Sequence, residues 1–371
     1  MASEHEQNEW SPRVFCDGCY DIFHYGHANQ FLQAKKMGSY LAAGIHPDHI
    51  IMSNKGPPVI NEADRYRIVR SVRWVDKVVE GIAYDITPEM LDGAGCDICV
   101  HGDDIVITDA GNDAYAAIKK QDRYKTCRRT PGISTTDLVG RMLLLTMDHH
   151  SKSSTLPAEY LENLRDLALC PNGRDPWVTV SQFDTQCGTV TVLVEGRKEK
   201  SPNRVVYVDG NFDLFHIGHV RFLEEASKRG DYLVVGVHSD QVVNGYKGQN
   251  YPIMSFHERI LTVTACRYVD EILIGAPYGI TPELLRHYNI SLVLHGLTDI
   301  TPSSNGSDPY ELARAQGIFE LIDSGSDISS GKIARKVIEN RLEYEIRHNK
   351  CVQKEKDALE ALLLKFQEAS G

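Results

Sequence analysis

A string of eleven residues that occurs twice constrains this chain most. Residues 17–27 read DGCYDIFHYGH and residues 209–219 read DGNFDLFHIGH, with seven identical positions. His216 follows His24 by 192 residues (216 − 24), a spacing that suits a duplicated domain and is far longer than the unit of a solenoid. The chain is therefore predicted to contain two copies of one domain.

Each copy of the string lies between a predicted strand, at 13–15 or 204–208, and a predicted helix that ends near Gly38 or Gly230. A helix that begins directly after a strand points its free N–H groups and positive dipole end at the carboxyl edge of the sheet, where they attract phosphate. Histidines three residues apart share one face of such a helix. The HxGH motifs thus predict that paired histidines stabilise charge on a phosphoryl group during its transfer: His24, His27, His216 and His219.

The repeat continues beyond this string. The segments at 40–46, 73–76 (RWVD) and 101–102 match those at 232–238, 267–270 (RYVD) and 295–296. Strands alternating with helices predict parallel sheets whose ligands bind at the carboxyl ends of the strands. We therefore expect an α/β fold with two tandem Rossmann-like, doubly wound parallel-sheet domains, followed by a C-terminal helix.

The repeat also sets the expected domain boundaries: a disordered N-terminus at 1–12, a first domain at 13–147, a linker at 148–203, a second domain at 204–340 and a helical tail at 341–371. The linker is too long for a plain loop, so part of it is expected to pack at the domain interface. In the tail, four apolar residues share one helical face, and we expect that face to dock on this chain or on a second subunit: Leu359, Leu362, Leu363 and Phe366.

Composition excludes several classes of function. The 371 residues carry a formal net charge of −11, which argues against a surface that coats nucleic acid. No apolar stretch approaches the roughly 20 residues that span a bilayer, and residues 1–12 lack the pattern of a signal peptide. A cytoplasmic protein is expected, with a peripheral place at the endoplasmic reticulum left open.

The cysteines include two CxxC pairs, Cys16/Cys19 and Cys96/Cys99, a spacing that is typical of zinc sites. The second repeat has Val208, Asn211, Ile290 and Val293 at the matching positions. Because that copy builds the same elements without thiols, we interpret the cysteines as small buried residues and expect no metal site formed by the protein alone.

Cationic loops are also repeated. Lys55 and Lys247 lie in glycine-flanked segments after the second strand of each domain and are expected to close on phosphates. Residues 128–136 (RRTPGISTT) bring an arginine and hydroxyls to a helix start. The second repeat aligns residues 324–330 (SGSDISS) there. That loop keeps the hydroxyls, loses the arginine and adds Asp327, so we expect the second site to be the weaker catalyst.

These strings resemble the cytidylyltransferases of the nucleotidyltransferase superfamily, which combine HxGH with an RTEGIST-type signature; Pro131 stands where that signature often has Glu. The resemblance implies catalytic roles for His24, His27, Lys55 and Arg129. It implies CTP contacts in the first repeat from Cys16, Asp17, Arg65, Asp76, Thr130, Ser134 and Thr135. In the second repeat it implies CTP contacts from Val208, Asp209, His216, His219, Lys247, His295, Gly296, Thr298, Gly325, Ser326 and Ser329.

The expected acceptor is phosphoethanolamine. Ile107 stands where the choline branch of the family has a tyrosine that suits a quaternary ammonium. A primary ammonium prefers carboxylates, and Asp17, Asp103 and Asp104 are the candidates. The expected reaction is in-line attack of the acceptor phosphate on the α-phosphorus of CTP, with Mg²⁺ entering on the nucleotide.

Several alternatives remain open. In the first alternative the acceptor is phosphocholine or another phospho-alcohol. In the second the enzyme is an adenylyltransferase of the same superfamily, and in the third the second repeat is the main CTP site. A class I aminoacyl-tRNA synthetase is disfavoured because the acidic chain lacks a KMSKS-like loop and a basic tRNA-binding domain. The expected partners are CTP and phosphoethanolamine, without nucleic acid; a homodimer is left open.

Overall fold

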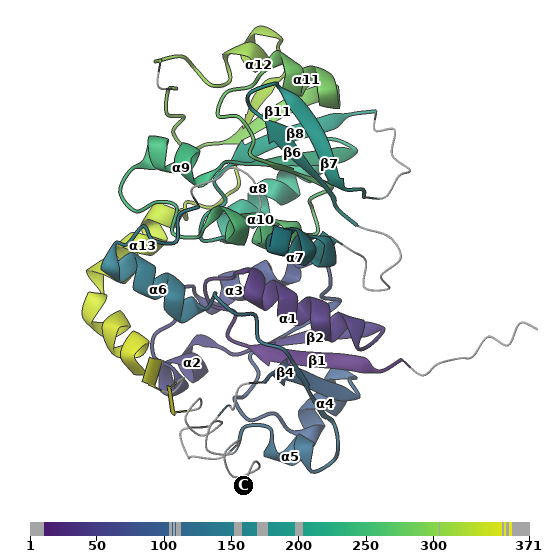
Figure 1. The fold of residues 1–371 in the computed structure, drawn as a ribbon. Coiled ribbons are helices and arrows are strands. Elements are labelled where there is room, and N and C mark those ends of the chain that lie inside the picture. The colour runs from purple at the N-terminus through teal and green to yellow at the C-terminus, as the bar shows by residue number, and fades with distance from the viewer. Residues whose placement is uncertain are drawn as a thin grey trace, which may run out of the picture.

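The computed structural model describes residues 11–103, 106, 108, 113–151, 158–168, 177–196, 203–303, 305–350, 352–353 and 356–357. It consists of two α/β domains stacked one above the other, the first in purple and blue and the second in green in Figure 1. Asp104, Ile107 and the apolar tail positions 359, 362, 363 and 366 lie outside the described residues.

The first domain contains a five-stranded parallel sheet with the order β3-β2-β1-β4-β5. Its strands are β1 (Arg13–Gly18), β2 (Tyr40–Ile45), β3 (Lys77–Glu80), β4 (Ile98–Gly102) and β5 (Tyr124–Cys127). Its helices are α1 (Tyr25–Lys36), α2 (Asp48–Asn54), α3 (Glu62–Arg70), α4 (Pro88–Ala94), α5 (Ala116–Lys119) and α6 (Thr135–Leu144). The inner strands read as continuous apolar runs because helices cover both faces of the sheet.

The second domain repeats this arrangement in the strand order β12-β11-β8-β9-β10. Its strands are β8 (Val205–Gly210), β9 (Tyr232–Val237), β10 (Glu271–Ile274), β11 (Ile290–Gly296) and β12 (Phe319–Ile322). Its helices are α8 (Ile217–Ser227), α9 (Asp240–Lys247), α10 (Phe256–Thr264), α11 (Pro282–Tyr288), α12 (Glu311–Ala315) and α13 (Ser330–Glu339). The two sheets confirm the predicted tandem Rossmann-like fold, in which strand order reverses between β1 and β4 and between β8 and β11.

The linker adds structure to the second domain. Strand β6 (Thr179–Asp184) pairs in parallel with β10, and β7 (Thr189–Val194) pairs antiparallel with β6, so the second sheet has seven strands. Helix α7 (Ala158–Ala168) touches both domains, because the Tyr160 ring stacks on His257 at 4.2 Å and Asp166 lies 3.8 Å from Lys36. Part of the linker therefore packs between the two domains.

The two domains meet through matching surfaces. An antiparallel bridge joins Val72 to Cys266. Arg73 donates to the backbone carbonyls of Thr264, Cys266 and Val269 at 2.6–3.1 Å. Arg267, its counterpart in the repeat, donates to the carbonyls of Val72 and Val75 at 2.7 Å. Such reciprocal contacts, together with the α1–α10 and α3–α8 contacts, are those of a two-fold symmetric dimer formed within one chain.

The arginine contacts predict a difference between Arg73 and its neighbour Arg70. Arg73→Ala leaves buried carbonyls without a donor at the interface, so we expect it to lower the free energy of unfolding by about 2–4 kcal/mol. Arg70 pairs with Glu80 on the surface, and Arg70→Ala is expected to change it by less than about 0.5 kcal/mol. Urea denaturation followed by circular dichroism measures both. Equal midpoints for the two variants would contradict the role assigned to Arg73.

Candidate active site

Both HxGH motifs open a helix, and their histidines lie ring on ring. His24 is the N-cap of α1, and its Nδ1 accepts a hydrogen bond from the Gly26 amide at 3.1 Å. The rings of His24 and His27 stack at 3.8 Å, as do the rings of His216 and His219. Glycine is needed between them, because a Cβ at Gly26 would lie 2.9 Å from the His24 ring. The prediction that each pair shares one helix face is confirmed.

These histidines are neutral at physiological pH. Burial lowers the pKa of His24, and it lowers the pKa of His27 to about 3, with Lys55 and Arg129 adding to that effect and Asp21 opposing it. In the part of the chain that the structure describes, His24 Nε2 and His27 Nδ1 have no hydrogen-bond partner. A buried nitrogen without a partner is costly, so these atoms fit a ligand that supplies one.

The first-repeat pocket encloses about 740 Å³ at the carboxyl ends of β1 and β4. Eight of the predicted residues line it: Asp17, His24, His27, Lys55, Arg129, Thr130, Ser134 and Thr135. Ser134 caps α6 by accepting from the Asp137 amide at 3.1 Å, which confirms the helix start predicted for this loop. Histidines, a lysine, an arginine and hydroxyls at two helix starts form a surface that suits a polyphosphate.

Asp17 lies at the floor of this pocket. It accepts a hydrogen bond from the Tyr115 hydroxyl at 2.9 Å and lies 3.5 Å from His46 Nε2. Burial raises its pKa, but the hydrogen bonds from His46 and Tyr115 and the charges of His101 and His46 bring the net pKa below its ordinary value. The floor of the first pocket is therefore negatively charged.

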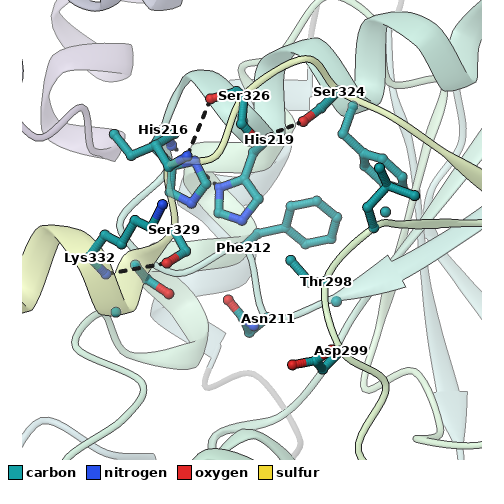
Figure 2. A pocket seen from close by; sticks show the side chains of 18 of the residues that line it. Asn211, Phe212, His216, His219, Thr298, Asp299, Ser324, Ser326, Ser329 and Lys332 are labelled. Atoms are coloured by element: carbon teal, nitrogen blue, oxygen red, sulfur yellow. Dashed lines mark hydrogen bonds between the residues drawn. The ribbon is translucent and has the colours of Figure 1, made fainter.

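The second-repeat pocket is larger, at about 1570 Å³. Ten predicted residues line it: Asp209, His216, His219, Lys247, His295, Gly296, Thr298, Gly325, Ser326 and Ser329. Figure 2 shows the two imidazole rings side by side, with Ser329 near them and Thr298 and Asp299 on the far wall. Lys247 Nζ lies 2.7 Å from Ser330 Oγ, so this lysine already points at the start of α13.

The floor of the second pocket differs from that of the first. Asp209 accepts from the Tyr310 hydroxyl at 2.5 Å, and burial raises its pKa to about 7 against the opposing effect of that hydrogen bond. Among the described residues His238, the counterpart of His46, gives neither of its nitrogens a hydrogen-bond partner. The second floor therefore carries less negative charge at neutral pH.

A comparison with known proteins assigns the family. The model of the cytidylyltransferase-like family matches residues 15–141 and 207–357, one match for each repeat. The chain belongs to this family. Similar curated proteins include the ethanolamine-phosphate cytidylyltransferases of Mus musculus (48% identical, over 94% of this chain and 91% of that protein) and Dictyostelium discoideum (43%, over 94% and 96%). That of Arabidopsis thaliana is 39% identical over 93% of this chain and 84% of that protein.

The cytidylyltransferase family also contains choline enzymes, and the match to them is shorter. Choline-phosphate cytidylyltransferase 2 of Arabidopsis thaliana is 39% identical over 35% of this chain. No helix in the described part of this cytidylyltransferase is long and apolar enough to cross a membrane.

Two predicted CTP contacts, Arg65 and Asp76, are not at the cytidylyltransferase pocket. Arg65 is fully buried and donates to the carbonyls of Cys19, His46 and Ile60 and to Asp48. Asp76 accepts from the Leu41 amide at 2.7 Å, at the amino end of β2, whereas the pocket is at the carboxyl end. The motifs that contain these residues were identified correctly, but the CTP contact predicted for them was wrong, because both residues stabilise the fold.

Three further predictions fall beside the pocket. Cys16 and Val208 are fully buried in β1 and β8, and neither lines the first-repeat or the second-repeat pocket. Asp103 is exposed and accepts from the Arg129 amide at 3.1 Å, so it holds the loop that carries Arg129. The CxxC cysteines Cys16, Cys96 and Cys99 are buried, as expected for small core residues, while Cys19 is half-buried.

Two kinds of residue at these pockets were not predicted from the sequence. Tyr115 and Tyr310 bind the floor aspartates, and the repeated pattern Asp-x-Tyr at 113–115 and 308–310 was the signal for them. Arg347 and Lys350 line the first-repeat pocket although they follow the second repeat. No local pattern marks those two residues, because their contacts are made with a distant part of the chain.

The buried histidines predict how stability depends on pH. His24, His27, His216, His219 and His238 all have a pKa lowered by burial. Below about pH 6.5 the unfolded chain binds protons that the folded chain does not, so the free energy of unfolding falls by up to about 1.4 kcal/mol per pH unit for each group. We expect a large loss between pH 7.5 and 5.5 in urea denaturation.

Asp209 provides the control, since its pKa is raised to about 7. Between pH 7 and 4 the Asp209 carboxyl holds a proton in the folded chain that it lacks in the unfolded chain. Its contribution to the free energy of unfolding therefore increases as the pH falls. Asp209→Asn removes this contribution. Between pH 7.5 and 5.5 the free energy of unfolding of the variant is expected to fall by about 1–2 kcal/mol more than that of the unmodified chain. Identical losses in the two proteins would contradict the assigned protonation of Asp209.

Proposed function

We propose that this chain transfers the cytidylyl group of CTP to phosphoethanolamine, giving CDP-ethanolamine and pyrophosphate for phosphatidylethanolamine synthesis. One observation carries the proposal: stacked neutral histidines meet Lys55 and Arg129 at the helix starts of a cytidylyltransferase-like domain. The extensive similarity to proteins named ethanolamine-phosphate cytidylyltransferase supports the choice of acceptor.

The reaction that this geometry supports is a direct displacement. A phosphate oxygen of phosphoethanolamine attacks the α-phosphorus of CTP in line, and the bond between that phosphorus and the bridging oxygen to the β-phosphate breaks. Pyrophosphate leaves with the electron pair, without a covalent enzyme intermediate. His24 and His27 donate hydrogen bonds to the phosphoryl oxygens, and Lys55 and Arg129 stabilise the negative charge that develops.

Mg²⁺ in this proposal is bound by the phosphate oxygens of CTP, where it would neutralise part of the triphosphate charge. Among the described residues no group of three or more His, Cys, Asp or Glu side chains is arranged to hold a metal ion. Lys55 and Arg129 line the pocket that would hold the same phosphates.

The first repeat is proposed as the main active site. Its loop at 128–136 brings Arg129 into the pocket. In the matching loop of the second repeat, Asp327 pairs with Lys332 at 2.7 Å. This carboxylate neutralises part of the positive charge at the second pocket. The second repeat retains its histidine pair and Lys247 and is proposed to bind CTP with little turnover.

For the acceptor, the negatively charged floor at Asp17 supports recognition of a primary ammonium. Asp103 and Asp104 stay candidates for a second contact. A homodimer and a peripheral place at the endoplasmic reticulum also stay predictions.

The acceptor is tested by pyrophosphate release from CTP with Mg²⁺, run in parallel with phosphoethanolamine and with phosphocholine. We expect strong release with phosphoethanolamine and at least about tenfold less with phosphocholine, because the trimethylated cation cannot donate hydrogen bonds to a carboxylate. ATP in place of CTP is the nucleotide control. Release with ATP and not with CTP would favour an adenylyltransferase and defeat the proposal.

The division of labour is tested by the same pair of substitutions in each repeat. His24→Ala/His27→Ala is expected to lower kcat by about 10³-fold or more, since it removes the donors to the transition state. His216→Ala/His219→Ala is expected to retain most of the turnover and to lose one CTP site in equilibrium dialysis. The reverse pattern of turnover would make the second repeat the main active site.

A further inference from the structure

The C-terminal segment crosses back from the second repeat to the first. Residues 341–350 are helical and follow α13. In Figure 1 this yellow helix runs past α6 towards α2, which ends just before Lys55. Tyr344 is buried, and its hydroxyl donates to the Pro58 carbonyl at 3.3 Å. The ring of His348 packs against Gly140 of α6, where a Cβ would lie 3.1 Å from it. The tail is thus held on the first domain.

Arg347 is the charged residue at the centre of this contact. Its Nη1 donates to the Pro57 carbonyl at 2.6 Å, and its Nη2 lies 2.8 Å from Asp21 Oδ2. The two side chains are 8% and 1% exposed, so water screens this pair little. Gly56 has φ +102°, and a Cβ there would lie 3.3 Å from the Arg347 Cβ. Arg347 therefore lies directly against the loop that follows Lys55.

Asp21 holds the same loop from the other side. Its carboxylate accepts from the amides of Val59 and Ile60 at 3.0 and 2.9 Å. Its backbone carbonyl accepts from the Thr135 hydroxyl at 2.7 Å, which joins it to the start of α6. A carboxylate this buried is destabilising unless cations or hydrogen-bond donors compensate for its lost hydration. Arg347 supplies that cation, and the result is one network that connects the Lys55 loop, Asp21 and the Ser134–Thr135 helix start.

Helix α13 adds a second contact of the same kind. Lys336 Nζ donates to the Val59 carbonyl at 2.6 Å, while Arg335 and Ile338 of the same helix line the second-repeat pocket. One continuous stretch of chain thus borders the second pocket and ties down residues 57–59 of the first.

We infer that Arg347 is a positioning residue of the first-repeat site: it ties residues 56–60 to Asp21 and so places Lys55 for the triphosphate. The first site is then incomplete without the segment that follows the second repeat. This inference rests on the proposal that the first repeat binds CTP. It agrees with the smaller volume of the first pocket, which Arg347 and Lys350 line.

The test measures CTP binding instead of turnover, using isothermal titration calorimetry of the full chain with Mg²⁺. In the background His216→Ala/His219→Ala, the heat reports the first repeat alone. Arg347→Ala is expected to weaken CTP binding about tenfold there, because Asp21 loses its cation and the Lys55 loop is released. Arg341→Ala is the matched control, since Arg341 lies on the same helix, is exposed and pairs only with Glu345 among the described residues. Its affinity is expected to stay within about twofold of the background.

Two further variants separate positioning from general damage. Arg347→Lys keeps a charge for Asp21 but cannot span both acceptors, and an intermediate affinity is expected. When Lys55 is already alanine, Arg347→Ala is expected to add little further loss, because the group that it places is gone. CTP binding by the second repeat, measured in the background His24→Ala/His27→Ala, is expected to be unchanged by Arg347→Ala.

Three outcomes would overturn the inference. The first is a CTP affinity of the first repeat that stays within twofold of the background after Arg347→Ala. The others are an equal further loss of affinity when Lys55 is already alanine, or an equal loss of CTP affinity in the second repeat. Failure of the first repeat to bind CTP, in a chain that otherwise binds it, would overturn it as well. Failure of the proposed function looks different. A chain that binds CTP with this dependence on Arg347, but releases no pyrophosphate with phosphoethanolamine, would refute the reaction and leave the positioning role in place.

Discussion

A fully buried arginine in each repeat holds together the loops that make the site. Arg65 joins the end of β1, the end of β2 and the start of α3 through the carbonyls of Cys19, His46 and Ile60, and Arg259 repeats these bonds with Asn211, His238 and Met254. Arg65 also pairs with Asp48, the first residue of α2, and Arg259 pairs with Asp240, the first residue of α9. A guanidinium has five donors in a fixed plane, so one side chain fixes several loops at one sheet edge. The histidine pair and the lysine loop on either side of it are positioned by that bond set.

The second constraint is that neither repeat is folded around its own residues alone. One continuous hydrophobic core contains residues of both domains, and the arginines of the RWVD and RYVD motifs exchange bonds across it. Arg141 of α6 forms a bidentate pair with Glu258 of the second domain, and Lys336 of α13 reaches the first. Each domain thus contacts the loop that precedes α3 or α10 of the other, at the carbonyl of Val59 or Ile253. The duplicated chain therefore resembles a two-fold dimer whose halves share one core.

Much of this arrangement was predictable from the sequence, because it is local. Two HxGH motifs at strand–helix junctions predicted the sheet edge and the shared helix face of the histidines, and the loop at 128–136 predicted the helix start at Ser134. Arg65 and Asp76 were misassigned because the sequence does not distinguish a repeated charged residue that binds a ligand from one that bonds to the backbone. Only the backbone groups around the side chain in the folded protein show which role it has. Arg347 was invisible for a different reason: its contact with Pro57 spans 290 residues, and no periodicity or motif encodes such a contact.

The two pockets also explain how one fold can hold unequal sites. A triphosphate in its ground state can be held by helix starts, neutral imidazoles and one lysine, all of which both repeats contain. The transition state carries additional charge on the transferred phosphoryl group, so the loss of one arginine acts mainly on the rate. At the position that matches Arg129 the second repeat has Ser324, and its loop also contains Asp327, which pairs with Lys332. We propose that such a site keeps nucleotide binding and gives up turnover, while α13 and the helix after it contact the loop that follows Lys55 in the first domain.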